Sequence, residues 1–124
     1  MLIKQISVFV ENKKGRTSAI IDALGNAGID ISALSLADAS EFGILRLIVD
    51  NPDKAKEVLN NIGVVVRISD VMAVKIPNKP GGLSETLTKI NDKGLNVEYM
   101  YAFVGNDGDY ATFVFKTDKL DDTK

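Results

Sequence analysis

The 124-residue sequence contains no cysteine and no histidine. Without cysteine there can be no disulfide, no thiolate nucleophile and no sulfur-ligated metal site. Without histidine the chain lacks the side chain that most often transfers protons near neutral pH and most often binds transition metals. One chain therefore cannot assemble a Ser-His-Asp triad, a Cys-His dyad or a histidine zinc site.

Long hydrophobic runs are also missing. No segment approaches the roughly 20 apolar residues that a membrane span requires, and the N-terminus alternates apolar with polar residues, unlike a signal peptide. The 15 Lys+Arg and 17 Asp+Glu give a formal charge of −2, so no basic field favours nucleic acid. We therefore expect a cytoplasmic protein with no membrane or nucleic-acid partner.

The sequence does contain an internal repeat. When Gly15 is placed on Gly81, residues 6–51 fall on residues 72–117 without a gap. Apolar positions stay in phase over the same span. The last matched positions are Leu45 with Ala111, Leu47 with Phe113 and Val49 with Phe115. We interpret the chain as two copies of one unit, at residues 1–68 and 69–124.

Each copy changes its hydrophobic period in the same order. Residues 3–10 alternate with period two, residues 15–27 follow a helical period, and residues 29–37 and 42–49 are two further strands. A second helix should begin at Asn51-Pro52 and end at Gly63, followed by a strand over residues 64–68. This order predicts an α+β fold of two ferredoxin-like βαββαβ units in tandem.

The second copy is shorter than the first. Thr117-Asp118 aligns with Asn51-Pro52, so its second helix should start there, and Lys124 ends the chain before most of that helix and the closing strand. The apolar face that includes Ala111, Phe113 and Phe115 should then lack part of its cover. Either a partner chain covers this face, or the sequence is a truncated form of a longer gene product.

Short polar motifs follow the first strand of each copy. The first reads Glu11-Asn12-Lys13-Lys14-Gly15-Arg16 and the second Pro77-Asn78-Lys79-Pro80-Gly81-Gly82-Leu83. Each is followed at the same spacing by Gly28-Ile29-Asp30-Ile31 or Gly94-Leu95-Asn96-Val97. With these motifs the chain resembles a tandem pair of ACT domains, the ligand-binding modules of many enzymes of amino-acid metabolism.

The resemblance implies a non-catalytic, allosteric regulatory protein that binds an amino acid. In that family the ligand lies at the interface between two units, whose second strands come side by side. The loop after the first strand of one unit and the second strand of its neighbour hold the ligand. Carried over to this sequence, the ligand-binding residues are Asn12, Gly15, Arg16, Asp30, Asn78, Gly81, Gly82, Leu83 and Asn96.

The residues themselves agree with this assignment and also allow plainer ones. A glycine turn at a helix N-terminus presents free N–H groups that suit a carboxylate, and Asp30 or Asn96 could accept a hydrogen bond from an ammonium group. The same glycines could instead serve only the turn, and Gly28 and Gly94 fit helix termination. Alternation of Tyr99, Tyr101 and Phe103 favours packing over ligand stacking.

Two functions remain open besides amino-acid binding. The chain could be a ligand-free structural subunit that forms a homodimer or docks on a metabolic enzyme. A small enzyme fits least well, because the sequence has no phosphate-binding loop, no nucleophile motif and no convergent titratable set. We expect no cofactor and no metal, and the acidic residues Asp118, Asp121 and Asp122 lack metal-loop spacing.

Overall fold

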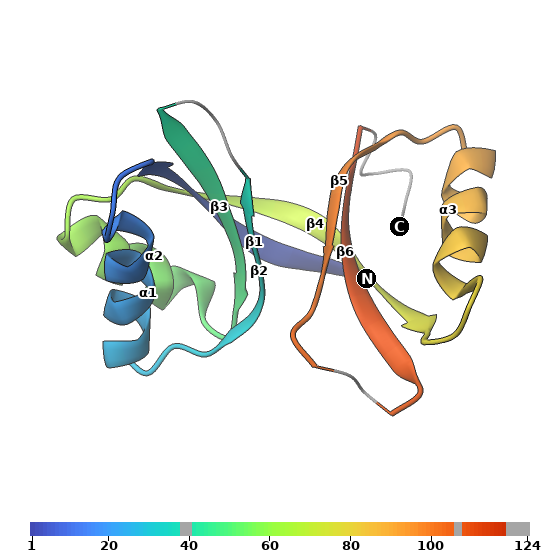
Figure 1. Cartoon of the computed structure of the whole chain (residues 1–124), viewed down its shortest axis with the longest axis horizontal. Helices are drawn as coiled ribbons and strands as arrows, with labels where there is room; N and C mark the ends of the chain where they lie inside the picture. The colour runs from blue at the N-terminus through green and yellow to red at the C-terminus, as the bar shows by residue number, and fades with distance from the viewer. Residues whose placement is uncertain (38–40, 106–107, 119–124) are drawn as a thin grey trace. The chain divides into compact units, whose positions relative to one another are not determined.

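The computed structural model describes residues 1–37, 41–105 and 108–118 (Figure 1). It is an α+β structure that divides into two compact units, one formed by Lys4–Ser69 and one by Met1–Ile3 together with Asp70–Lys124. The tandem ferredoxin-like fold predicted from the sequence is thereby confirmed. Among the described residues no helix is long and apolar enough to cross a membrane.

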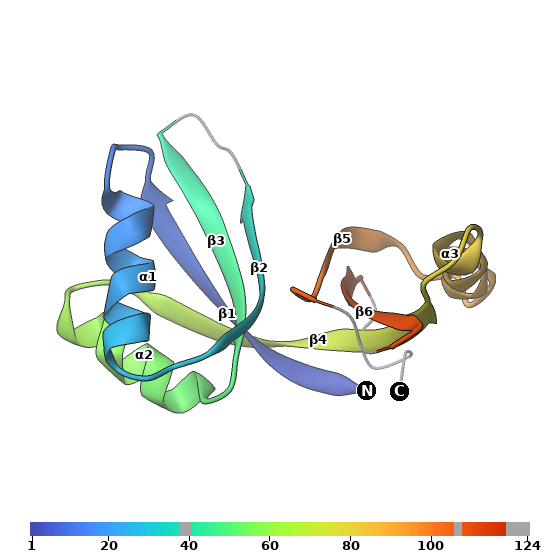
Figure 2. The same cartoon turned by 60° about the horizontal axis from the view of Figure 1, so that its bottom comes forward.

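The unit Lys4–Ser69 contains one complete βαββαβ set. Its elements are β1 (Leu2–Glu11), α1 (Arg16–Asn26), β2 (Ile31–Ala37), β3 (Phe42–Val49), α2 (Pro52–Asn61) and the beginning of β4 (Val66–Pro77). The strand order is β2-β3-β1-β4, and both helices lie on the same face (Figure 2). Between helices and sheet lies a core that includes Ile6, Val8, Leu24, Leu45, Leu47, Ala55 and Leu59.

Helix boundaries in this unit follow the predicted signals. The side chain of Asn51 accepts a hydrogen bond from the Lys54 N–H at 3.2 Å, and Pro52 begins α2. Gly28 has a φ of +74°, and the Ile29 N–H bonds the Leu24 carbonyl across the end of α1. Gly28 and, with the same geometry, Gly94 are therefore helix-terminating residues, as expected.

The other unit is built from the rest of β4 with α3 (Gly82–Asp92), β5 (Val97–Ala102) and β6 (Tyr110–Thr117). These strands are ordered β4-β6-β5. On the other side of β4, the Ala73 N–H donates to the Met1 carbonyl at 2.8 Å, so the first residues of the chain occupy the position of a closing strand. A separate core cluster comprises Met72, Ile76, Ile90, Leu95 and Phe115.

Strand β4 differs from the expectation of two separate strands, one over residues 64–68 and one as the first strand of the second copy. It runs without interruption from Val66 to Pro77 and contains residues of both units. No glycine or proline occurs in it before Pro77, so nothing in the local sequence breaks the extended backbone. The fourth strand of the first repeat and the first strand of the second are one strand.

The second strands of the two repeats do not pair with each other over the described residues of this chain. The hydrogen-bonded order β2-β3-β1-β4-β6-β5 has β2 and β5 at its two ends. Over the described residues, β2 pairs with β3 and β5 pairs with β6. Because β1 and β4 occupy the middle of the order, the second strands become the outermost ones.

The repeat alignment is wrong by two positions in the third strand. Ile6 pairs with Leu47, whereas its equivalent Met72 pairs with Phe115. Phe115 therefore corresponds to Leu47, not to Val49. The additional residues lie in the connection between β5 and β6. A slip of two leaves every side chain on its original face, so the hydrophobic pattern could not reveal it.

The expectation of an exposed face in the second copy is wrong for Phe115. Phe115 is completely buried in the second core cluster, and Ala111 and Phe113 are half-buried. The corrected register explains the burial of Phe115, because it places this ring opposite Met72 in the core of the unit. Thr117 ends β6 and does not start a helix. Asp121 and Asp122 lie outside the described residues.

The corrected register makes Thr117 the equivalent of Val49, so a polar residue of the second copy replaces an apolar residue of the first. Thr117 is fully buried, and its Oγ1 has no hydrogen-bond partner within the part of the chain that the structure describes. A buried hydroxyl without a partner destabilises the folded state. Thr117→Val should therefore raise the free energy of unfolding by about 1–2 kcal/mol in urea denaturation. The reverse change, Val49→Thr, should lower it, and a lower stability of Thr117→Val would contradict this account.

Candidate functional site

The loops that precede α1 and α3 have the same backbone geometry. Gly15 and Gly81 each have a φ of +85° and stand at the N-cap of their helix without a side-chain cap. Equivalent hydrogen bonds anchor the loops, from the Asn12 N–H to the Glu41 carbonyl and from the Asn78 N–H to the Asp109 carbonyl. Both helices consequently begin with N–H groups that no side chain of the cap residue occupies.

A cavity of about 220 Å³ lies beside the first loop. It opens between this loop, the start of α1 and the end of β2, and its lining residues are Val10, Glu11, Asn12, Lys13, Thr17, Leu36, Ala37 and Gly43. Gly43 leaves little room for a side chain, since a Cβ at this position would be 3.0 Å from the Ala37 carbonyl oxygen and 3.2 Å from a methyl group of Leu36. The cavity lies entirely within the unit Lys4–Ser69.

Two opposite charges line this cavity. The Lys13 Nζ lies 3.3 Å from the Glu11 Oε2, and both side chains are substantially exposed, at 68% and 42%. An exposed ion pair contributes little to folding, so its members can exchange partners with a ligand. Neither was among the predicted site residues, although they flank Asn12. Their positions on either side of Asn12 are the sequence feature that could have identified them.

The other predicted residues of the first copy do not gather at this cavity. Arg16 lines a different groove of about 490 Å³ with Phe9 and Phe42, and Gly15 lines neither. Asp30 precedes β2, whereas the cavity lies at the end of that strand. Within this unit the structure therefore brings Asn12 to the cavity and leaves Asp30 at the opposite end of the sheet.

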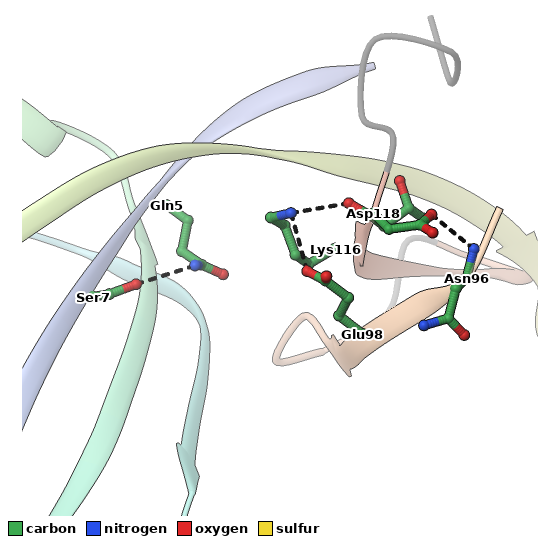
Figure 3. Close-up of polar contacts among 7 residues, drawn as sticks. Gln5, Ser7, Asn96, Glu98, Lys116 and Asp118 are labelled. Carbon is green, nitrogen blue, oxygen red and sulfur yellow. Dashed lines mark hydrogen bonds and ion pairs between the residues drawn. The ribbon is translucent and has the colours of Figure 1, made fainter.

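Asp30 and Asn96 take part in a repeated backbone connection. The Asp30 N–H donates to Oδ1 of Asp50 at 3.1 Å, and the Asn96 N–H donates to Oδ1 of Asp118 at 2.9 Å (Figure 3). In each copy an aspartate after the third strand thus holds the residue before the second strand. The repeat alignment concealed this relation, because without a gap it pairs Asp50 with Lys116.

The second loop is more closed than the first at the position after its N-cap glycine. Gly82 is buried, and a Cβ there would overlap the carbonyl oxygen of Pro77. The equivalent residue in the first loop is the exposed Arg16. Leu83 packs against the second core cluster. These contacts give both residues a packing role beside their predicted binding role.

Strand β5 carries a polar contact and an aromatic pair. The Lys116 Nζ, on β6, lies 3.1 Å from Oε1 of Glu98 and also donates to the Thr117 carbonyl (Figure 3). The same figure shows a separate contact within β1, in which the Gln5 Nε2 donates to the Ser7 Oγ. The rings of Tyr99 and Tyr101 stack with centroids 6.5 Å apart. Among the described residues no group of three or more acidic side chains could hold a metal ion.

Comparison with protein families decides the identity of the fold. The family model described as "ACT domain pair" matches residues 1–124. The chain belongs to this family. The crystal structure of protein BT0572 from Bacteroides thetaiotaomicron resembles this ACT domain pair with a TM-score of 0.90 and 39% identity, covering 98% of this chain and 83% of that one. Comparison with the curated proteins gives no match.

More distant structures share the fold. The regulatory subunit of aspartate kinase from Thermus thermophilus has a TM-score of 0.73 at 14% identity, covering 98% of this ACT domain pair and 91% of that chain. The corresponding subunit from Thermus flavus has a TM-score of 0.67 at 16% identity, with coverages of 98% and 90%. At these identities the similarity concerns the arrangement of strands and helices.

The packing of Gly82 predicts opposite effects for two Gly→Ala changes. Gly82→Ala should lower the free energy of unfolding by about 1–3 kcal/mol, because its methyl group overlaps the Pro77 carbonyl. Gly25→Ala, in α1, meets no atom within 4 Å and should raise it by up to about 1 kcal/mol. Urea denaturation of both variants checks the pair, and equal effects would show that the second loop is not closed.

Proposed function

We propose that this ACT domain pair is a non-catalytic regulatory protein that binds a small zwitterion, an amino acid in the simplest case. The main support is the ion pair of Glu11 and Lys13 at the 220 Å³ cavity, next to the uncapped start of α1. One wall thus presents an anion, a cation and the positive end of a helix dipole. An α-amino acid carries the two complementary charged groups on the same carbon atom.

The proposed ligand pose follows from these charges. The ligand carboxylate approaches Lys13 and the N-terminus of α1, and its ammonium group approaches Glu11. The ligand side chain then lies toward Val10 and the end of β2. Since a cavity of about 150 Å³ accommodates benzene, one of 220 Å³ suits a ligand of about nine heavy atoms. Asn12 supplies further hydrogen-bonding groups to the same wall.

We place the remaining ligand contacts on the second strand of a neighbouring unit. Strand β2 is at one end of the strand order and exposes Leu34 and Leu36, at 44% and 54%. An end strand with exposed leucines can pair with a strand of another chain. A second copy is the proposed neighbour, and a homodimer brings its Asp30 or Asn96 into use. A metabolic enzyme is the proposed recipient of the signal.

Thermal unfolding with single amino acids tests this function. For a dissociation constant between about 10 µM and 1 mM, 10 mM of the correct ligand should stabilise the chain by about 1.5–4 kcal/mol. Lys13→Ala should weaken the affinity for the ligand at least tenfold and so reduce the stabilisation. Lys79→Ala is the matched control, since Lys79 holds the same place in the second loop. No stabilisation by any amino acid would favour a ligand-free structural subunit.

Gly43→Ala tests the cavity itself. The added methyl group should crowd the end of β2 and abolish ligand stabilisation, measured by the same thermal assay. Its position corresponds to Ala111 in the other unit, which shows that the fold accepts alanine there. The control is Ala111→Gly, which should leave ligand binding unchanged. Full binding by Gly43→Ala would exclude this cavity as the site.

A further inference from the structure

A second cavity lies in the other unit, far along the sequence from the loop of the proposed function. Its volume is about 150 Å³, and it opens between β4 and α3. The lining residues are Met72, Val74, Thr86, Lys89, Ile90, Lys93 and Leu95. Met72, Ile90 and Leu95 are buried members of the second core cluster, so the floor of the cavity is apolar. Its exposed rim carries the two lysines.

The two repeats differ in the residues that their first helices carry at the position of this cavity. Helices α1 and α3 match when Gly15 is placed on Gly81, so Lys89 and Lys93 correspond to Ala23 and Ala27. In the first unit these alanines pack half-buried against a core to which α2 contributes Ala55 and Leu59. Small residues at this position allow a second helix close by. The lysines of α3 replace them with long, charged side chains.

The lysines are arranged to meet one anion. They are four residues apart, and residues at this spacing lie on the same side of a helix, one turn apart. Within residues 1–37, 41–105 and 108–118 neither forms an ion pair with a carboxylate. Their aliphatic stems can cover the apolar floor while both ammonium groups remain in water. The cavity thus combines a hydrocarbon floor with a doubly cationic rim.

We propose that this cavity binds a small carboxylate with a branched or aromatic hydrocarbon body. The body lies on Met72, Ile90 and Leu95, and the carboxylate lies between the ammonium groups of Lys89 and Lys93. The volume matches a body of about six heavy atoms, since a cavity of this size accommodates benzene. The proposal is independent of the amino-acid site.

Methyl NMR of the full chain tests the proposal with phenylacetate and 4-methylpentanoate as probes. Resonances of Met72 and Ile90 should shift saturably, with a dissociation constant between about 0.1 and a few mM. The neutral analogue phenylacetamide should bind at least tenfold more weakly. Binding should also weaken as salt increases, because it depends on exposed charges.

Variants that copy residues of the first repeat provide the controls. Lys89→Ala combined with Lys93→Ala copies Ala23 and Ala27 and should weaken phenylacetate binding at least tenfold. Thr86→Ile copies Ile20 and should block the cavity. Lys54→Ala combined with Lys56→Ala removes the same charge from α2 and should leave binding unchanged.

Several results would overturn the proposal. One is equal affinity for the acid and its amide, and another is an equal loss in the α2 control. A third is phenylacetate shifting methyl groups around Val10 and Leu36 instead, which would assign it to the first cavity. Absence of any shift at about 20 mM, well above the expected dissociation constant, would also overturn the proposal. An acidic helical peptide that then shifts Met72 and Ile90 would assign this face to a protein partner.

Discussion

Strand β4 is the element on which both units depend. It pairs with β6 over Met72 to Pro77, and the order of strands places its other side against β1. Its first residues belong to the unit Lys4–Ser69 and the rest to the unit that includes Met1–Ile3. An unbroken strand needs a run without glycine or proline, and residues 66–76 provide one. The duplication is therefore joined by a shared strand and not by a linker.

A shared scaffold leaves the two copies free to differ at individual positions. The backbone of the first loop is reproduced in the second, including the positive φ of its N-cap glycine. The side chains around it are not reproduced, because Gly82 replaces Arg16 and Ala111 replaces Gly43. The structural glycines are kept and the residues near the cavities change.

Much of the fold could be predicted because local signals and the repeat agreed. Asn51-Pro52 indicated the start of α2, and Gly28 indicated the end of α1. The errors came from features without a local signal. The slip of two positions before β6 preserves the inward and outward alternation, so Phe113 appeared to match Leu47. Only the pairing of strands distinguishes the two registers.

The candidate site was less predictable than the fold, for a related reason. Loop position identified Asn12, but which side chains meet around a cavity depends on strands that are distant in sequence. The end of β2 and Gly43 complete the cavity, and neither carries a polar side chain that a motif could detect. Asp50 and Asp118 were missed because an alignment without a gap separates them.

The size of the proposed ligand limits what its binding can accomplish. A molecule of about nine heavy atoms supplies a few kcal/mol when present well above its dissociation constant. It can therefore redirect only an equilibrium whose two states differ by a similar amount. The proposed pairing of β2 with a second chain is such an equilibrium, since it would exchange exposed leucines and unpaired backbone groups for intermolecular contacts. In the proposed function, regulation by this ACT domain pair is therefore a change in association, with the folded unit itself unchanged.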